Sequence, residues 1–190
     1  METFLVSTGL VALAEIGDKT QLLALILAAK FRRPAPIILG ILAATLLNHA
    51  AAATVGYLAA QWLTGHAFQT AVGIAFIVMA AWALIPDKAD GVPGEGLGRY
   101  GIFLATLVAF FLVEIGDKTQ IATSLLAARF DDIVLVTAGT TLGMMLANVP
   151  AVFLGQAVLR VVPLSWVRIG AAVVFAVIGC WILAATYGEF

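Results

Sequence analysis

Two copies of one polar motif carry the residue types best suited to chemistry. The heptapeptide Glu-Ile-Gly-Asp-Lys-Thr-Gln occupies positions 15–21 and recurs, identically, at positions 114–120, inside long apolar runs. Carboxylate and amide oxygens are the ligands that hard cations such as Mn²⁺, Ca²⁺ and Mg²⁺ prefer. The motifs therefore predict a site for a hard divalent cation. Its expected ligands are Glu15, Asp18, Gln21, Glu114, Asp117 and Gln120.

The charges of the two motifs suggest an exchange reaction. Four carboxylates and two lysines leave a net charge of −2, which one divalent cation or two protons would neutralise. The alternative, two lysine–carboxylate pairs that only hold helices together, is disfavoured because buried ion pairs rarely stabilise more than apolar packing does. It would also leave two carboxylates unpaired. We expect supporting roles, such as holding carboxylates or adding an oxygen at a helix break, for Lys19, Thr20, Lys118, Thr119, Asn48 and Asn148.

The composition places these motifs in a membrane. The chain has 190 residues, of which 63% are hydrophobic and 11% charged, with a mean hydropathy of +1.08. Soluble domains carry about 25% charged residues. A water-soluble enzyme, a disordered tail and a nucleic-acid binder are therefore excluded, and the lipid bilayer is the expected surrounding. The fold class predicted is an all-α membrane protein.

Apolar runs bounded by charge, glycine and proline predict six transmembrane helices. The stretch between the third and fourth runs is rich in glycine and proline, as flexible linkers are. We therefore expect a first three-helix repeat over 1–86, a cytoplasmic linker over 87–99 and a second three-helix repeat over 100–190. The six helices are expected near 3–29, 35–62, 67–86, 100–128, 133–159 and 165–187.

The distribution of basic residues predicts the orientation. Seven lysines and arginines outside the expected spans lie on one side, and Arg129 alone lies on the other. The positive-inside rule then places the linker and the seven basic residues in the cytoplasm and both termini outside. These seven are Lys30, Arg32, Arg33, Lys88, Arg99, Arg160 and Arg168.

The repeat extends well beyond the motifs. At the same offset of 99 positions, Gly40 and Gly56 meet Gly139 and Gly155, and Trp82 meets Trp181. Each repeat holds three helices, an odd number, so the second repeat must be inverted relative to the first. Inverted repeats with a midplane site at their interface are typical of secondary transporters.

Small and polar residues mark the second and fifth helices. Small residues at every fourth position form a stripe on each, which predicts close helix packing; a sliding surface for a transport motion is the alternative. We expect Asn48, His49 and Asn148 to hydrogen-bond between helices more readily than to bind a metal ion. At the repeat offset Asn148 matches His49 rather than Asn48, so the symmetry is imperfect.

Two Glu-x-Gly-Asp-Lys-Thr motifs in opposed repeats resemble uncharacterised protein family 0016, the transmembrane protein 165 family. The resemblance covers essentially the whole chain, and both motifs, at 15–20 and 114–119, fit the family pattern. It implies a cation/proton antiporter that transports Mn²⁺ or Ca²⁺. The short loops suggest a bacterial member in the inner membrane. Manganese as the cargo comes from the resemblance, because residue chemistry alone reaches only a hard divalent cation.

The leading hypothesis is therefore a secondary transporter that exports Mn²⁺ in exchange for protons, not an enzyme and without a prosthetic group. Two other classes remain open. The paired acids could serve an intramembrane hydrolase, although the neighbouring lysines and the duplication argue against it. A passive channel or an exporter of small organic solutes would also fit six spans. The sequence leaves the oligomeric state undetermined.

Overall fold

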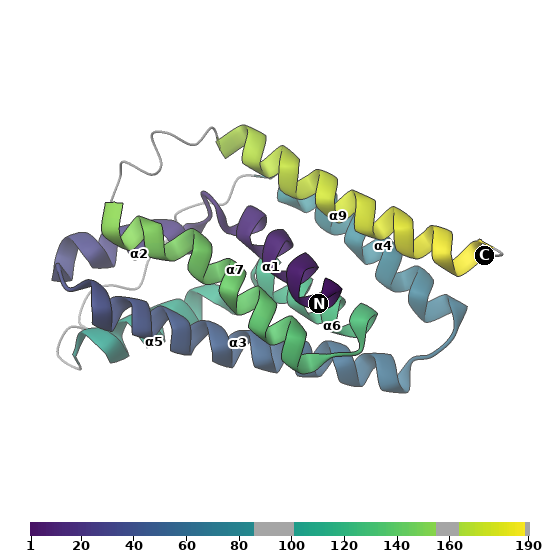
Figure 1. Ribbon diagram of the computed structural model, residues 1–190, viewed down its shortest axis with the longest axis horizontal. Helices are drawn as coiled ribbons and strands as arrows, with labels where there is room; N and C mark the ends of the chain where they lie inside the picture. The colour runs from purple at the N-terminus through teal and green to yellow at the C-terminus, as the bar shows by residue number, and fades with distance from the viewer. Residues whose placement is uncertain (86–100, 155–163, 189–190) are drawn as a thin grey trace.

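The computed structural model describes residues 1–85, 101–154 and 164–188, and every regular element within them is a helix. The linker predicted at 87–99, Gly155 and Arg160 lie outside the described residues. Figure 1 shows a bundle of helices that run in several directions. In chain order they are α1 (Glu2–Glu15), α2 (Lys19–Phe31), α3 (Pro34–Trp62), α4 (His66–Ala83), α5 (Ile102–Glu114), α6 (Lys118–Phe130), α7 (Ile133–Leu154) and α9 (Leu164–Tyr187).

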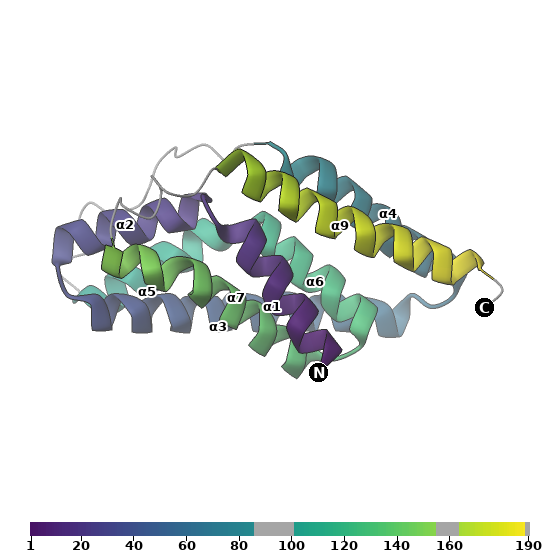
Figure 2. The same cartoon turned by 45° about the horizontal axis from the view of Figure 1, so that its top comes forward.

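Two of the six predicted helices are each broken in two. The segment expected at 3–29 forms α1 and α2, and the segment expected at 100–128 forms α5 and α6. Figure 2 shows α1 and α2 meeting at an angle. Both breaks fall inside the polar motifs, at Gly17 and Gly116, whose φ angles are +82° and +74°. A right-handed helix cannot pass through positive φ, so the backbone must turn at each glycine.

Four helices, α3, α4, α7 and α9, are long and apolar enough to cross a bilayer. The halves α1, α2, α5 and α6 have 13 or 14 residues each, fewer than the roughly 20 that a crossing needs. The outward faces of the long helices are apolar. Leu47, Val55, Val78 and Val177 are all more than half exposed, as side chains that contact lipid would be.

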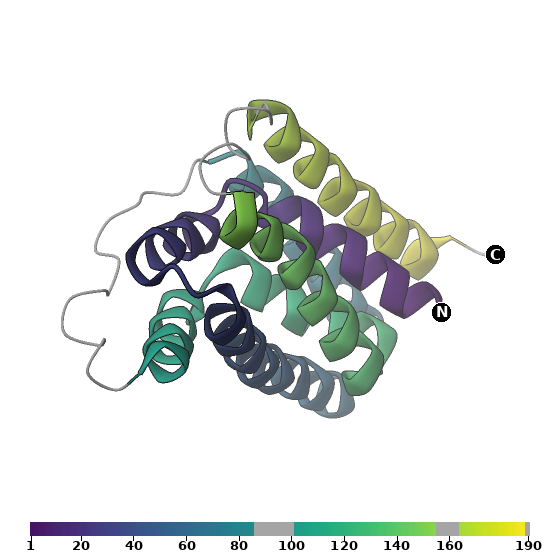
Figure 3. The same cartoon turned by 60° about the vertical axis from the view of Figure 1, so that its left-hand side comes forward.

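The packing links the two halves of the chain reciprocally. Helix α3 of the first half lies against α5 and α6 of the second, while α7 of the second half lies against α1 and α2 of the first. The long helices α4 and α9 lie side by side along one edge of the bundle in all three ribbon views (Figures 1–3). The broken helices are therefore enclosed by helices from the opposite half.

Glycines allow this close packing, which confirms the prediction for the small-residue stripes. A Cβ on Gly40 would lie 2.7 Å from Thr106 on α5, and a Cβ on Gly139 would lie 2.9 Å from Ser7 on α1. These two contacts are equivalent at the repeat offset. On Gly56 a Cβ would collide with the backbone of α6. A helix of each half thus packs closely against glycines of the other half, where any larger residue would collide with it.

Candidate cation site

Each polar motif folds as a tight turn between two half-helices. Asp18 donates its backbone N–H to the carbonyl of Glu15 at 3.1 Å, Ile16 has φ −64° and ψ 117°, and Gly17 has φ +82°. These are the features of a type II turn, in which the third residue requires positive φ and so favours glycine. The second motif repeats them, with a 3.0 Å bond from Asp117 to Glu114.

Glutamine side chains complete the turns. The Gln21 amide oxygen accepts the Gly17 N–H at 2.9 Å, and the Gln120 amide oxygen accepts the Gly116 N–H at 2.7 Å. Gln21 also donates to the carbonyl of Ala147 on α7 at 2.9 Å. In this structure the amides of both predicted glutamine ligands therefore bind backbone groups, while each amide oxygen keeps a second lone pair.

The turns gather three carboxylates from the two motifs. One oxygen each of Glu15, Asp18 and Asp117 lie within 4.8 Å of one another. Glu15 is the last residue of α1, while Asp18 and Asp117 precede the first turns of α2 and α6. All three side chains are buried. We call Glu15, Asp18 and Asp117 the carboxylate triad. The two glutamates thus contribute unequally, because Glu114 is not in this group, whereas both aspartates are.

Glu114 is held by donors from α3. The Thr45 hydroxyl donates to one carboxylate oxygen at 3.2 Å, and the Asn48 amide donates to the other at 3.2 Å. Asn48 also donates to the carbonyl of Phe111 at 3.1 Å, which confirms its predicted role between helices. Thr45 was not predicted from the sequence. Its position one turn before Asn48 on the same helix face was the available signal.

Glu15 has a different environment from its counterpart. Both of its carboxylate oxygens are buried and accept no well-formed hydrogen bond from the described residues, and the Asn148 side chain lies next to them. At the repeat offset the donors Thr45 and Asn48 are replaced by Met144 and Ala147, and neither of those side chains can donate a hydrogen bond to a carboxylate. The different hydrogen bonding of the two glutamates therefore follows from the different residues at equivalent positions of α3 and α7.

Other buried polar groups in the described chain also lack hydrogen-bond partners. The Asn148 amide nitrogen donates to the carbonyl of Met144 at 3.1 Å, while its oxygen is buried and without a partner in the described chain. The Thr20 hydroxyl and both His49 ring nitrogens are likewise buried and unpartnered there. Thr119, in contrast, donates its hydroxyl to Asp117 at 3.2 Å. Oxygen atoms without partners are thus found in the first motif and on α7.

Both lysines reach beyond their own motifs. Lys19 forms an ion pair with the carboxylate of Asp117 at 2.8 Å, across the two motifs. The Lys118 ammonium donates to the carbonyl of Ile85, at the end of α4, at 2.9 Å and lies 5.8 Å from the centre of the Trp82 ring. A continuous helix would have placed Lys19 beside Glu15 of its own motif. The break instead directs it to the opposite motif.

The donor set fits a hard divalent ion as the bound species. The four carboxylates and two lysines of the motifs carry a net charge of −2. Burying charge in an apolar bundle is costly unless the charge is neutralised. A divalent cation supplies that neutralisation with the oxygen ligands it prefers, and two protons supply the same charge.

Comparison with known proteins agrees with this chemistry. The family described as divalent cation/proton antiporter GDT1 matches this chain twice, over residues 3–91 and 102–190. A protein of Vibrio cholerae serotype O1 (strain ATCC 39541 / Classical Ogawa 395 / O395), named "Putative manganese exporter", is 50% identical over 169 residues, which cover 88% of this chain and 84% of that protein. No solved structure matches this chain.

Proposed function

Because this chain belongs to the GDT1 family of divalent cation/proton antiporters, we propose that it exports Mn²⁺ in exchange for protons through the carboxylate triad. Divalent cation transport follows from the family and from the relative. The single observation that supports this site is the burial of Glu15, Asp18 and Asp117 with their oxygens within 4.8 Å. Ca²⁺, which prefers the same ligand type, is the second candidate cargo.

The proposed architecture has six crossings in two inverted repeats. Its support is the pair of matching family segments and the reciprocal packing of α3 and α7 on the broken helices of the other half. In this arrangement each broken helix crosses the membrane as two half-helices. Irregular backbone at membrane depth is tolerated where protein buries it, and discontinuous helices at a repeat interface are typical of ion sites in transporters.

The proposed stoichiometry is two protons for each Mn²⁺. The net charge of −2 carried by the two motifs is cancelled equally by either load. An exchange that keeps the buried site neutral in both directions avoids carrying an uncompensated charge through the bilayer. Glu15, whose oxygens accept no well-formed hydrogen bond from the described residues, is the group we assign to bind the ion and then a proton.

Glu114 has a positioning role in this proposal. Its two oxygens are occupied by Thr45 and Asn48, so it fixes the end of α5 against α3 and thereby places Asp117. The glutamines act in the same way on the two turns. In this proposal they and Glu114 hold the two turns and the ion binds to the triad.

Lys19 acts as a tethered competitor of the ion. Its ammonium neutralises Asp117 in the structure, and its side chain is 27% exposed, so it has room to leave. Arrival of Mn²⁺ would release Lys19 from Asp117. At every stage either Lys19 or the ion then serves as a counter-charge for the three carboxylates. Without this competitor, the carboxylates would hold a divalent ion too tightly to release it.

The chain is placed in the inner membrane of a bacterium, with both termini outside the cytoplasm. The apolar helices and the bacterial relative support a membrane location, and the excess of basic residues on one side supports the orientation. Export then means binding from the cytoplasm and release outside, while protons return.

Mn²⁺ flux in proteoliposomes with an enclosed pH reporter tests this proposal. Wild type should move Mn²⁺ and protons in opposite directions, and Glu15→Gln and Asp117→Asn should both lose flux. Unchanged flux in both variants would remove the triad as the site. Currents far above antiport turnover would indicate a channel, and indifference to Mn²⁺ would indicate a solute exporter.

A further inference from the structure

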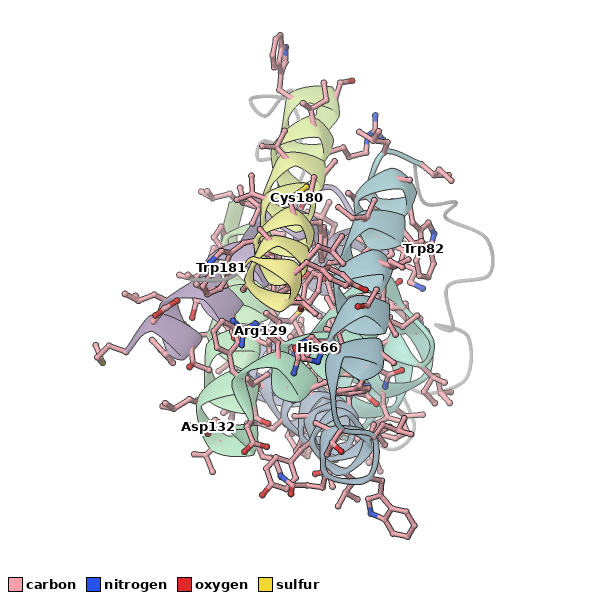
Figure 4. The ribbon with its side chains drawn as sticks, turned by 90° about the vertical axis from the view of Figure 1, so that its right-hand side faces the viewer. His66, Trp82, Arg129, Asp132, Cys180 and Trp181 are labelled. Atoms are coloured by element: carbon pink, nitrogen blue, oxygen red, sulfur yellow. The ribbon has the colours of Figure 1, made fainter. Side chains whose placement is uncertain are left out.

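A second polar cavity lies far along the bundle from the carboxylate triad, where α4 begins and α6 and α9 end. Its volume is about 370 Å³. Arg129 and His66 lie next to each other at this end of the bundle, below Trp181 on α9 (Figure 4). No residue of the two polar motifs contributes to it. The residues lining it are Gly65, His66, Gln69, Arg129, Ile182, Ala185 and Thr186.

Arg129 is fixed but lacks a counter-charge in the described part of the chain. Its guanidinium lies 4.8 Å from the centre of the Trp181 ring, a distance at which cation–π attraction holds it in place. Its Nε atom is buried without a hydrogen-bond partner among the described residues, and no described carboxylate lies within ion-pair distance. A positioned guanidinium of this kind is suited to bind an anion in two-pronged fashion.

The nearest acidic residues have other partners. Asp131 accepts a hydrogen bond from Gln61 at 2.9 Å, and Asp132 accepts the backbone N–H of Leu135 at 2.8 Å. Neither forms an ion pair with Arg129. An anionic ligand can therefore reach the guanidinium without displacing either carboxylate.

The remaining lining combines donors with apolar surface. His66 and Gln69 each carry a ring or amide N–H, and α4 begins here with Gly65, which provides no side-chain cap for the first backbone N–H groups. Ile182 and Ala185 form the apolar wall. A ligand with a negatively charged oxygen head and an apolar body matches such a lining.

The depth of the cavity corresponds to a membrane surface. Trp62, Trp181 and Tyr187 lie around this end of the bundle, and they are 85%, 47% and 67% exposed. Exposed tryptophan and tyrosine mark the level of the lipid headgroups. By the orientation predicted from the basic residues, this is the outer leaflet, where Arg129 is the exception to the charge distribution.

We propose that this cavity binds the phosphate of an anionic phospholipid headgroup, with Arg129 as the principal contact and His66 and Gln69 as additional donors. The acyl chains would lie along Ile182 and the exposed apolar face of α9. The site would tie the outer ends of α4 and α9 to α6. A free phosphate ion has the same head chemistry, and the experiment must separate the two.

Thermal unfolding of the full chain in a neutral detergent is the test. Phosphatidylglycerol and, separately, inorganic phosphate are titrated into wild type, Arg129→Gln and the matched control Arg33→Gln, an exposed arginine at the start of α3. Phosphatidylglycerol should raise the unfolding temperature of wild type and the control. Arg129→Gln should require about 10- to 100-fold more lipid for the same shift, the loss expected for charge-assisted hydrogen bonds.

Arg129→Lys keeps the positive charge but loses the planar, two-pronged guanidinium, so we expect it to require an intermediate amount of lipid. This variant replaces Arg129→Gln in the test if Arg129→Gln does not fold. Equal lipid shifts in wild type and the Arg129 variants would overturn the proposal. A shift produced equally well by inorganic phosphate would overturn the lipid assignment.

Discussion

Replacing Glu15 by glutamine should separate the roles of the two motif glutamates. The two motifs together carry −2 and are neutral with one Mn²⁺ bound. In Glu15→Gln the charge falls to −1, so the loaded site keeps an excess positive charge in a buried place. Glu114→Gln is the matched control, because it removes the same charge from the equivalent position of the other motif.

The expected magnitudes differ because the contacts differ. Removing a residue that only orients a metal ligand costs about 10- to 100-fold in affinity. Glu114, bonded to Thr45 and Asn48, should fall within that range. Glu15 is a ligand in this account, so its loss should exceed about 100-fold, or about 2.8 kcal/mol.

The assay is the Mn²⁺ concentration dependence of flux in proteoliposomes, with direct Mn²⁺ titration of the purified protein as a second readout. Glu15→Gln should also exchange about one proton per ion, since only one further charge can be neutralised at the altered site. Equal affinities for Glu15→Gln and Glu114→Gln, or a greater loss in Glu114→Gln, would refute the asymmetric site.

Three further predictions concern the residues around the triad. Lys19→Gln removes the competing ammonium, so Mn²⁺ should bind about 10-fold more tightly while turnover falls; unchanged affinity in a Mn²⁺ titration would contradict the role of Lys19. Asn48→Ala removes a bond to the charged Glu114 and should cost about 1.5–3 kcal/mol in the free energy of unfolding in detergent; a change below about 0.5 kcal/mol would show that this bond is dispensable. Gly56→Ala should destabilise by about 1–3 kcal/mol because its Cβ collides with the backbone of α6, whereas Gly9→Ala, with open space around it, should be neutral in the same melts.

Periodicity and composition predicted the apolar helices well. They were not sufficient to locate the breaks inside the two motifs. The segments at 35–62 and 67–86 correspond closely to α3 and α4, because long apolar runs between polar residues have one stable form in a bilayer. The same reasoning predicted the first run as one helix through Gly17, with a break there only as an alternative. Glycine is compatible with both a helix and a turn, and local pattern does not distinguish them.

The hydrogen bonds and the ion pair at the two breaks come from side chains for which the sequence predicted another role. Gln21 was predicted as a metal ligand, yet its amide oxygen binds Gly17 and its nitrogen binds α7. The bond to α7 depends on which helix packs against the turn, and spacing within one segment contains no such information. Lys19 likewise finds Asp117 only because the break redirects it.

The inequality of the two glutamates was present in the sequence as a departure from the repeat. Thr45 and Asn48 correspond to Met144 and Ala147, but their meaning emerges only once α3 is seen to face Glu114. Comparing the two repeats locates the motifs easily. It does not reveal such differences, because it assigns the same function to equivalent positions.

Anomalous X-ray scattering from Mn²⁺-soaked crystals would locate the transported ion itself. If the ion binds among Glu15, Asp18 and Asp117, the anomalous peak will lie within coordination distance of one oxygen from each of the three, with Lys19 displaced from Asp117. A peak at any other group of oxygens, in crystals of protein that transports Mn²⁺, would contradict binding at the carboxylate triad.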